Sequence, residues 1–265
     1  MRKGLLFCLA LALPWKAGAF IVDADTVALW HFDPGQELIA ADSGPGELDL
    51  ALDRSPADGS EGSTIPVFTT GCIGGALRFL HGTSEAYGGY GETASGFAFG
   101  ANEVSVELLL RTTSTTYDHL FVSPTRFVVV LDGGKVGSFV GDGMGWSNTA
   151  SSNVLVNDGS WHYVAVTYDG ADLRVFVDGA LAGETSYVAT IGPMSSFYVG
   201  GRANNSFFAG DIDEARLSST TRDPAEIAVI AGLVAVECPE PTSALAGAAA
   251  LAVVTLRRRY SRGSS

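Results

Sequence analysis

The chain has 265 residues, of which 46% are hydrophobic and 17% are charged. This length suits one large globular domain with short segments at both ends, so we expect no second globular domain. Residues 20–256 hold nine basic residues against 29 acidic ones, a net charge of −20. Such a surface argues against nucleic acid and anionic membrane as partners and favours cations or neutral ligands.

The first 19 residues have the pattern of a secretory signal peptide. Arg2 and Lys3 precede an apolar run from Leu5 to Leu13, and Ala17-Gly18-Ala19 supplies the small residues that a signal peptidase needs. We therefore expect that residues 1–19 direct export and are removed.

The first part of the domain combines short strands with long loops. Residues 26–32 are apolar and predict a strand, whereas residues 34–66 are rich in proline and glycine and predict loops. Residues 77–79 belong to a second strand. A glycine-rich loop that carries Tyr87 and Tyr90 is expected to follow.

The middle of the chain continues with strands. Residues 104–108 alternate between apolar and polar side chains, which predicts a half-buried strand. Residues 127–131 and 135–140 flank an Asp-Gly-Gly turn and predict a hairpin. Residues 141–157 form a predicted long loop that carries Trp146.

Residues 161–179 give the strongest local signal in the chain, a β-hairpin with the sequence WHYVAVTYDGADLRVFVDG. In its first strand Val164, Val166 and Tyr168 share one face, and Tyr163, Ala165 and Thr167 share the other. The second strand alternates in the same way at Leu173, Val175 and Val177. Asp-Gly pairs end both strands, because tight turns need the positive φ angle that glycine tolerates.

The last part of the domain holds further strands and one helix. Strands are predicted at residues 181–188, 197–201 and 211–217. Asp223 as N-cap, Pro224 in the first turn and Glu226 three residues on predict the start of a short helix. Many short strands with almost no helix predict an all-β, two-sheet antiparallel sandwich.

Four motifs in order resemble the laminin G-like jelly-roll domains of the concanavalin A-like class. The hairpin at residues 161–179 is similar to the signature hairpin of that family, and three further pieces match its opening strand and loop, its second strand and its closing strands: Ala28–Asp33 with Ala41–Gly44, Gly74–Phe79, and Val199–Gly201 with Phe208–Leu217. The resemblance covers roughly residues 25–233. It implies a jelly-roll fold and adhesion or glycan recognition.

The C-terminal segment resembles a PEP-CTERM sorting signal. The motif Pro239, Glu240 and Pro241 is followed by the apolar stretch 243–256 and then by Arg257, Arg258 and Arg259. The resemblance implies a transmembrane helix at 243–256, processing by an exosortase, and delivery to the cell surface or extracellular matrix of a Gram-negative-type bacterium. The three arginines would stay on the cytoplasmic side.

The apolar stretch is short for a permanent anchor. Fourteen residues rise by about 21 Å as a helix, whereas the hydrocarbon core is about 30 Å thick. A simple tail anchor is the alternative to transient insertion. The expected division is a signal peptide at 1–19, a jelly-roll domain at 20–234 and a sorting segment at 235–265.

The chain lacks a recognisable catalytic motif. A glycoside hydrolase needs two carboxylates at a set separation, and the run from Asp211 to Glu214 lacks the leading glutamate and the spacing of the laminarinase motif. The four histidines are isolated in sequence. We expect a non-catalytic protein, with a concanavalin A-like glycan hydrolase and a purely structural matrix protein as the alternatives.

A structural calcium ion is implied by the family resemblance. It would lie where the opening Asp-Ser-Gly loop meets the closing strand, which corresponds to Asp42 and Asp213 with help from Ser43-Gly44 carbonyls. Alternatively, Asp42 caps a turn and Asp213 faces solvent or Arg216.

Three aromatic residues are candidates for carbohydrate binding. Tyr87, Tyr90 and Trp146 lie in predicted glycine-rich loops, where aromatic faces could meet a sugar ring. The alternative is that these rings cover the ends of the sandwich.

Two cysteines, Cys72 and Cys238, remain after removal of the signal peptide. An exported protein meets an oxidising compartment in which they could pair. Because Cys238 borders the predicted processing motif, the sequence leaves the pairing open and favours unpaired thiols.

Overall fold

The computed structural model describes residues 20–35, 37–99, 102–202 and 206–238. The predicted signal peptide, the Pro-Glu-Pro motif, the apolar stretch 243–256 and the arginine cluster lie outside these residues. Among the described helices, none has the length and hydropathy needed to cross a membrane.

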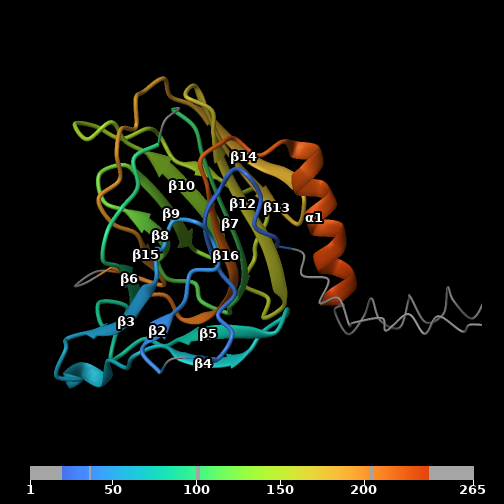
Figure 1. The fold of residues 1–265 in the computed structure, drawn as a ribbon. Helices are drawn as coiled ribbons and strands as arrows, with labels where there is room; N and C mark the ends of the chain where they lie inside the picture. The colour runs from blue at the N-terminus through green and yellow to red at the C-terminus, as the bar shows by residue number, and fades with distance from the viewer. Residues whose placement is uncertain (1–19, 36, 100–101, 203–205, 239–265) are drawn as a thin grey trace, which may run out of the picture.

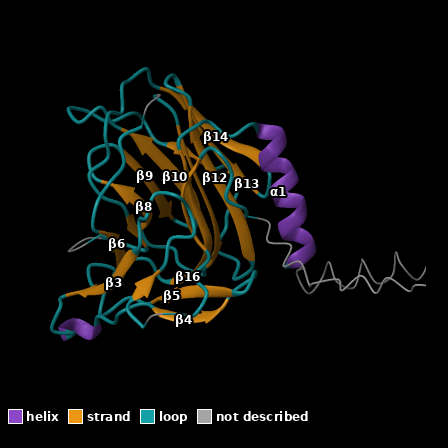
Figure 2. Ribbon diagram, viewed as in Figure 1, coloured by secondary structure: helices purple, strands orange, loops and turns teal. Residues whose placement is uncertain are grey.

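The described residues form two antiparallel sheets that face each other (Figures 1 and 2). The first, sheet A, runs in the order β14 (Ala180–Ser186), β13 (Asp172–Val177), β12 (Trp161–Tyr168), β7 (Val104–Arg111), β16 (Gly210–Ser218), β5 (Gly75–Phe79) and β4 (Val67–Thr70), and β1 (Thr26–Trp30) also pairs with β16. Sheet B runs in the order β11 (Ala150–Ser151), β10 (Lys135–Val140), β9 (Phe127–Asp132), β8 (Asp118–Ser123), β15 (Tyr198–Val199), β6 (Gly88–Thr93), β3 (Leu50–Ser55) and β2 (Ile39–Ala40). The predicted two-sheet sandwich is confirmed.

The main core lies between the sheets, and the hairpin of β12 and β13 shows how the alternating pattern builds it. Val164, Val166 and Tyr168 belong to the large core, together with Leu173 and Val175 of β13. Tyr163 and Ala165 belong to a second cluster on the opposite face of sheet A. The predicted assignment of side chains to two faces is therefore confirmed, because a strand turns successive side chains to opposite sides.

The outer face of sheet A is covered by the helix α1 (Pro224–Glu237), which stands against the sheet in Figure 1. A short 3-10 helix, η1 (Ser60–Gly62), lies in the loop after β3. Ile227, Ile230 and Val234 of α1 pack on the second cluster, and Phe20 joins it from the N-terminal side. The predicted N-cap is confirmed, since the side chain of Asp223 accepts a hydrogen bond of 2.7 Å from the Ala225 N–H.

The prediction that residues 104–108 form a half-buried strand was wrong, because both faces of the strand are buried. Glu107 in β7 is completely buried, because α1 and its flanking segments cover that face. Its carboxylate accepts 2.5 Å and 2.7 Å hydrogen bonds from the Tyr163 hydroxyl and the Arg216 Nε. The polar position in the alternating pattern thus marks a buried ion pair rather than a solvent-facing residue.

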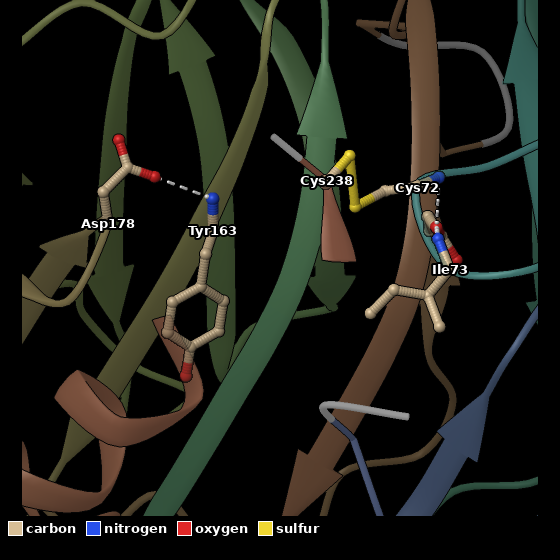
Figure 3. Close-up of a disulfide and its surroundings, with 6 residues drawn as sticks. Cys72, Ile73, Tyr163, Asp178 and Cys238 are labelled. Atoms are coloured by element: carbon tan, nitrogen blue, oxygen red, sulfur yellow. Dashed lines mark hydrogen bonds between the residues drawn. A yellow bond between two sulfur atoms is a disulfide. The ribbon is translucent and has the colours of Figure 1, made fainter. Parts of the chain in front are cut away.

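A disulfide joins the end of α1 to sheet A (Figure 3). Cys72, in the turn between β4 and β5, is bonded to Cys238, the C-cap of α1, with 5.4 Å between their Cα atoms. The preference for unpaired thiols was wrong. Sequence spacing hid the pairing because 166 residues separate the two cysteines.

Candidate functional site

Four loops meet at an open groove of about 540 Å³. They are the loop after β10, the β12–β13 turn, the segment after β14 and the residues just before β7. The lining residues are Asn102, Asp142, Met144, Gly170, Val188, Ala189 and Thr190. The groove therefore combines a carboxylate, an amide and apolar side chains in loops that a rigid sandwich holds in place.

The loop after β10 is shaped by Asp142. Its Oδ1 accepts hydrogen bonds of 2.8 Å from the N–H groups of Met144 and Gly145, which lowers the pKa of the carboxyl and keeps it ionised. Gly143 makes this turn possible with a φ of 92°. Its Oδ2 has no hydrogen bond among the described residues, so it can accept from a ligand hydroxyl.

The same loop presents apolar side chains to solvent. Met144 is 98% exposed and Trp146 is 44% exposed. The indole ring of Trp146 stands edge-on to Phe139 at 5.1 Å between centroids, so one side of the ring is supported while part of it is open. Val188, in the segment after β14, is also largely exposed.

The segment after β14, which forms the other side of the groove, is held in place by the side chains of Tyr168 and Asn102. The hydroxyl of Tyr168 lies 2.9 Å from the carbonyl oxygens of Tyr187 and Ala189 and accepts a 3.0 Å bond from the Ala189 N–H. Asn102 donates to the same Ala189 carbonyl and accepts from the Ile191 N–H at 2.8 Å. Because both polar ends of its amide are engaged, Asn102 positions the loop.

Of the three aromatic residues predicted to bind sugar, Trp146 alone is exposed, and it follows the groove residues Asp142 and Met144 on the same loop. Tyr90 is 7% exposed, lies in β6 rather than in a loop, and packs against Tyr198 and Phe207. The prediction that Tyr90 lies in a loop was wrong, and its ring is covered as the alternative expectation has it. Tyr87 is half-buried in the loop before β6.

The two aspartates of the predicted calcium site have different surroundings. Both oxygens of Asp42 accept backbone bonds, Oδ1 from Leu29 and Gly44 at 2.8 and 2.6 Å and Oδ2 from Leu48 at 2.9 Å. Asp213 is fully buried, and its Oδ2 accepts 2.9 Å bonds from the N–H groups of Cys72 and Ile73. Asp42 thus closes its own loop, which is the turn-capping alternative.

Asp213 is the member of this pair with an oxygen left over. Its Oδ1 is buried without a hydrogen-bond partner among the described residues, and burial raises its pKa to about 8. Within the same residues no group of three or more His, Cys, Asp or Glu side chains is placed to hold a metal ion. A cation at Asp213 would need backbone carbonyls for most of its ligands.

The acidic run in β16 does not present an open catalytic pair. Asp211 is bound by the guanidinium groups of Arg78 and Arg111 at 2.8 and 2.7 Å. Glu214 is 2% exposed and bonds to His31 at 2.8 Å, and Asp213 is buried. A hydrolase needs two carboxylates that reach one substrate, and these three acids are engaged or enclosed.

Residues 85–228, more than half of the chain, match a laminin G family described as the concanavalin A-like lectin/glucanases superfamily. The chain belongs to this superfamily. A search of curated proteins gave no match.

Solved structures share the fold at low identity. Domain 4 of an extracellular GH43 arabinanase from Geobacillus stearothermophilus, solved with arabinotriose, has a TM-score of 0.60 and 19% identity, over 78% of this chain and 98% of that one. The receptor-binding domain of botulinum neurotoxin type G has a TM-score of 0.57 and 11% identity, over 79% and 51%. A third structure is of botulinum neurotoxin type C, whose cell entry is described as dependent on interaction with two ganglioside molecules. It has a TM-score of 0.56 and 8% identity, over 80% of this chain and 52% of that one. This superfamily member spans about half the length of the toxin chains.

Sequence reasoning missed most of the groove. Asp142, Met144 and Val188 were not predicted as site residues, and the available signal was the GDGMGW run at 141–146, whose glycines and aspartate mark an exposed turn. Asn102 and Tyr168 carried no such signal, because their role depends on a loop more than 15 residues away in sequence.

Proposed function

We propose that this superfamily member is a non-catalytic carbohydrate-binding module. The observation that carries the proposal is the groove lined by Asp142, Met144 and Val188, where two exposed apolar side chains accompany a carboxylate whose Oδ2 has no hydrogen bond among the described residues. Trp146 is exposed two residues after Met144 on the same loop. Protein sites for sugars pair an aromatic or apolar surface with a few polar groups. The arabinotriose bound to the arabinanase domain and the gangliosides of the type C toxin support a glycan as the ligand class.

Binding to a glycan array tests the proposal. We expect the wild-type protein to bind, and Trp146→Ala or Asp142→Ala to lose binding by about tenfold, because each removes one of a few specific contacts. Leu155→Ala is the matched control, since Leu155 is an exposed apolar residue that does not line the groove. Equal binding by all four proteins, or sugar release from a bound glycan, would contradict the proposal.

We also propose a structural calcium ion held by Asp42 and Asp213, with Oδ1 of Asp213 as its open ligand. The support for it is the buried Oδ1 without a hydrogen bond, which a cation would satisfy. Melting temperature with calcium and with excess chelator tests it. We expect calcium to raise the melting temperature of the wild-type protein and to leave Asp213→Asn unchanged, whereas identical curves with and without chelator would end the proposal.

We propose that the chain is exported, inserted through residues 243–256 and processed by an exosortase at Pro239–Pro241. The disulfide supports an oxidising compartment for the domain. Intact-mass analysis of the protein released by the producing cells tests this route. The expected products begin after residue 19 and end near the Pro-Glu-Pro motif, and a released chain that keeps Arg257–Arg259 would contradict it.

A further inference from the structure

The outer face of α1 is apolar and exposed. Val229, Leu233 and Val236 are 64%, 47% and 78% exposed, and their spacing of four and three residues places them on one side of the helix. The other side, which includes Ile230, is buried on sheet A. A helix that is apolar all round is normally covered on all sides, so this face needs a cover that the described residues do not supply.

The first described residues extend the apolar surface at the C-terminal end of α1. Ile21 and Val22 are both exposed, and they line a cavity of about 720 Å³ together with Glu237. We call Ile21, Val22, Val229, Leu233 and Val236 the apolar patch. Scattered single apolar side chains need no explanation, but an exposed apolar row along one helix, with two more exposed apolar residues at the end where the chain enters and leaves the domain, does.

Both chain ends that leave the domain here lead to apolar segments of the sequence. Phe20 follows directly on the predicted signal peptide. Cys238 is held to Cys72 by the disulfide and precedes the stretch 243–256 by four residues. At about 3.5 Å per residue, those steps span at most about 18 Å. A bilayer that receives residues 243–256 must therefore lie close to the C-terminal end of α1, where the apolar patch ends.

We propose that the apolar patch lies on the surface of the lipid bilayer while the chain is anchored. This inference rests on the proposed membrane insertion of residues 243–256. The lipid is neutral or zwitterionic, because the patch contains no lysine or arginine and the domain carries a net charge of −20 over residues 20–256. Burial of the aliphatic side chains at the headgroup boundary then supplies the attraction.

Depth-dependent quenching tests the proposal on the full chain in phosphatidylcholine vesicles. An NBD fluorophore is attached to Val236→Cys in a Cys8→Ser background, in which the disulfide protects the other two cysteines. The matched control carries the fluorophore at Met144→Cys, which is 98% exposed and lies outside the patch. With nitroxide-labelled lipid, we expect the label at 236 to lose roughly half of its emission and the label at 144 to keep it.

A second variant separates a specific contact from mere proximity. Adding Val229→Gln and Leu233→Gln should reduce quenching at 236 while the chain still floats with the vesicles. If the chain floats but the label at 236 is not quenched, the patch does not touch lipid and the inference is wrong while the anchor stands. A chain that does not float overturns both. If the label at 236 is not quenched by the lipid and sedimentation shows a dimer, a second copy of the chain covers the patch and the lipid contact is wrong.

Discussion

The hydroxyl of Tyr163 in β12 donates a 2.5 Å hydrogen bond to the carboxylate of Glu107 in β7, on the face of sheet A that α1 covers. The same carboxylate pairs with Arg216 of β16 at 2.6 Å. Three adjacent strands thus share one buried ion pair and its hydrogen-bonded tyrosine beneath the helix. This network explains why a carboxylate is tolerated at a fully enclosed position.

Removing the negative charge of Glu107 should destabilise the domain. Glu107→Gln leaves the Arg216 guanidinium buried without its carboxylate, so we expect the free energy of unfolding to fall by about 3 kcal/mol or more. Urea denaturation measures the change. Glu184→Gln, which breaks the partly exposed pair with Arg174, is the control and should cost no more than about 1 kcal/mol. Equal losses in the two variants would mean that the buried network contributes nothing special.

The disulfide between Cys72 and Cys238 should stabilise the sandwich by limiting the unfolded chain. Because it closes a loop of 166 residues, the expected loss on replacing both cysteines with serine is about 3–5 kcal/mol. Thermal unfolding with and without reductant measures it. The double variant should also become insensitive to reductant, and an unchanged melting temperature of the reduced wild-type protein would refute the prediction.

His162 should make stability depend on pH near neutrality. Its Nδ1 and Nε2 lie 2.9 Å and 3.1 Å from carboxylates of Asp178 and Asp158, and the hydrogen bond with Asp178 is the main cause that raises its pKa above the usual value. Since the folded pKa exceeds the unfolded one, the stabilisation is complete below about pH 6.5 and is lost as the pH rises through the folded value.

The difference in unfolding free energy between wild type and His162→Gln measures this contribution. It should be largest at about pH 5.5, below the ordinary histidine pKa, and should shrink as the pH rises through the raised pKa of the folded state. A difference that is constant across this range would show that the two carboxylates do not hold the proton.

The groove should bind glycan more weakly when the segment after β14 loses its hydrogen bonds to Tyr168. Tyr168→Phe removes the hydroxyl that holds the carbonyls of Tyr187 and Ala189, so we expect weaker glycan binding by about three- to tenfold and a stability loss of about 1 kcal/mol. Tyr117→Phe is the control, because Tyr117 is an exposed tyrosine just before β8. It should change neither glycan affinity nor stability. Unaltered binding by Tyr168→Phe would show that this loop does not form part of the site.

Much of the fold could be predicted from short stretches of sequence. The alternating residues of β12 predicted which side chains face each cluster, and Asp223 with Pro224 predicted the start of α1. Both signals are local, because strand periodicity and helix capping involve residues within a few positions of one another.

The site was less predictable. Trp146 was placed correctly in an exposed loop, but Tyr90 was misplaced because the glycines around it belong to a strand. Gly91 packs against Leu50 and Leu52 there, and Gly88 lies against Phe207. Glycine near an aromatic residue thus indicated close packing between elements, which the sequence could not distinguish from a loop.

Local sequence patterns were enough to predict the family, the sandwich and the clearly alternating strands such as β12 and β13, since these follow from repeats along neighbouring residues. The expectation of loops over residues 34–66 was wrong where β2 and β3 lie. Three features could not be read from local patterns: Cys72 pairs with Cys238, α1 encloses Glu107, and Asp142 and Val188 border one groove. The physical reason is that each of these depends on contacts between residues far apart in the chain, whose encounter is set by the order of strands in the two sheets.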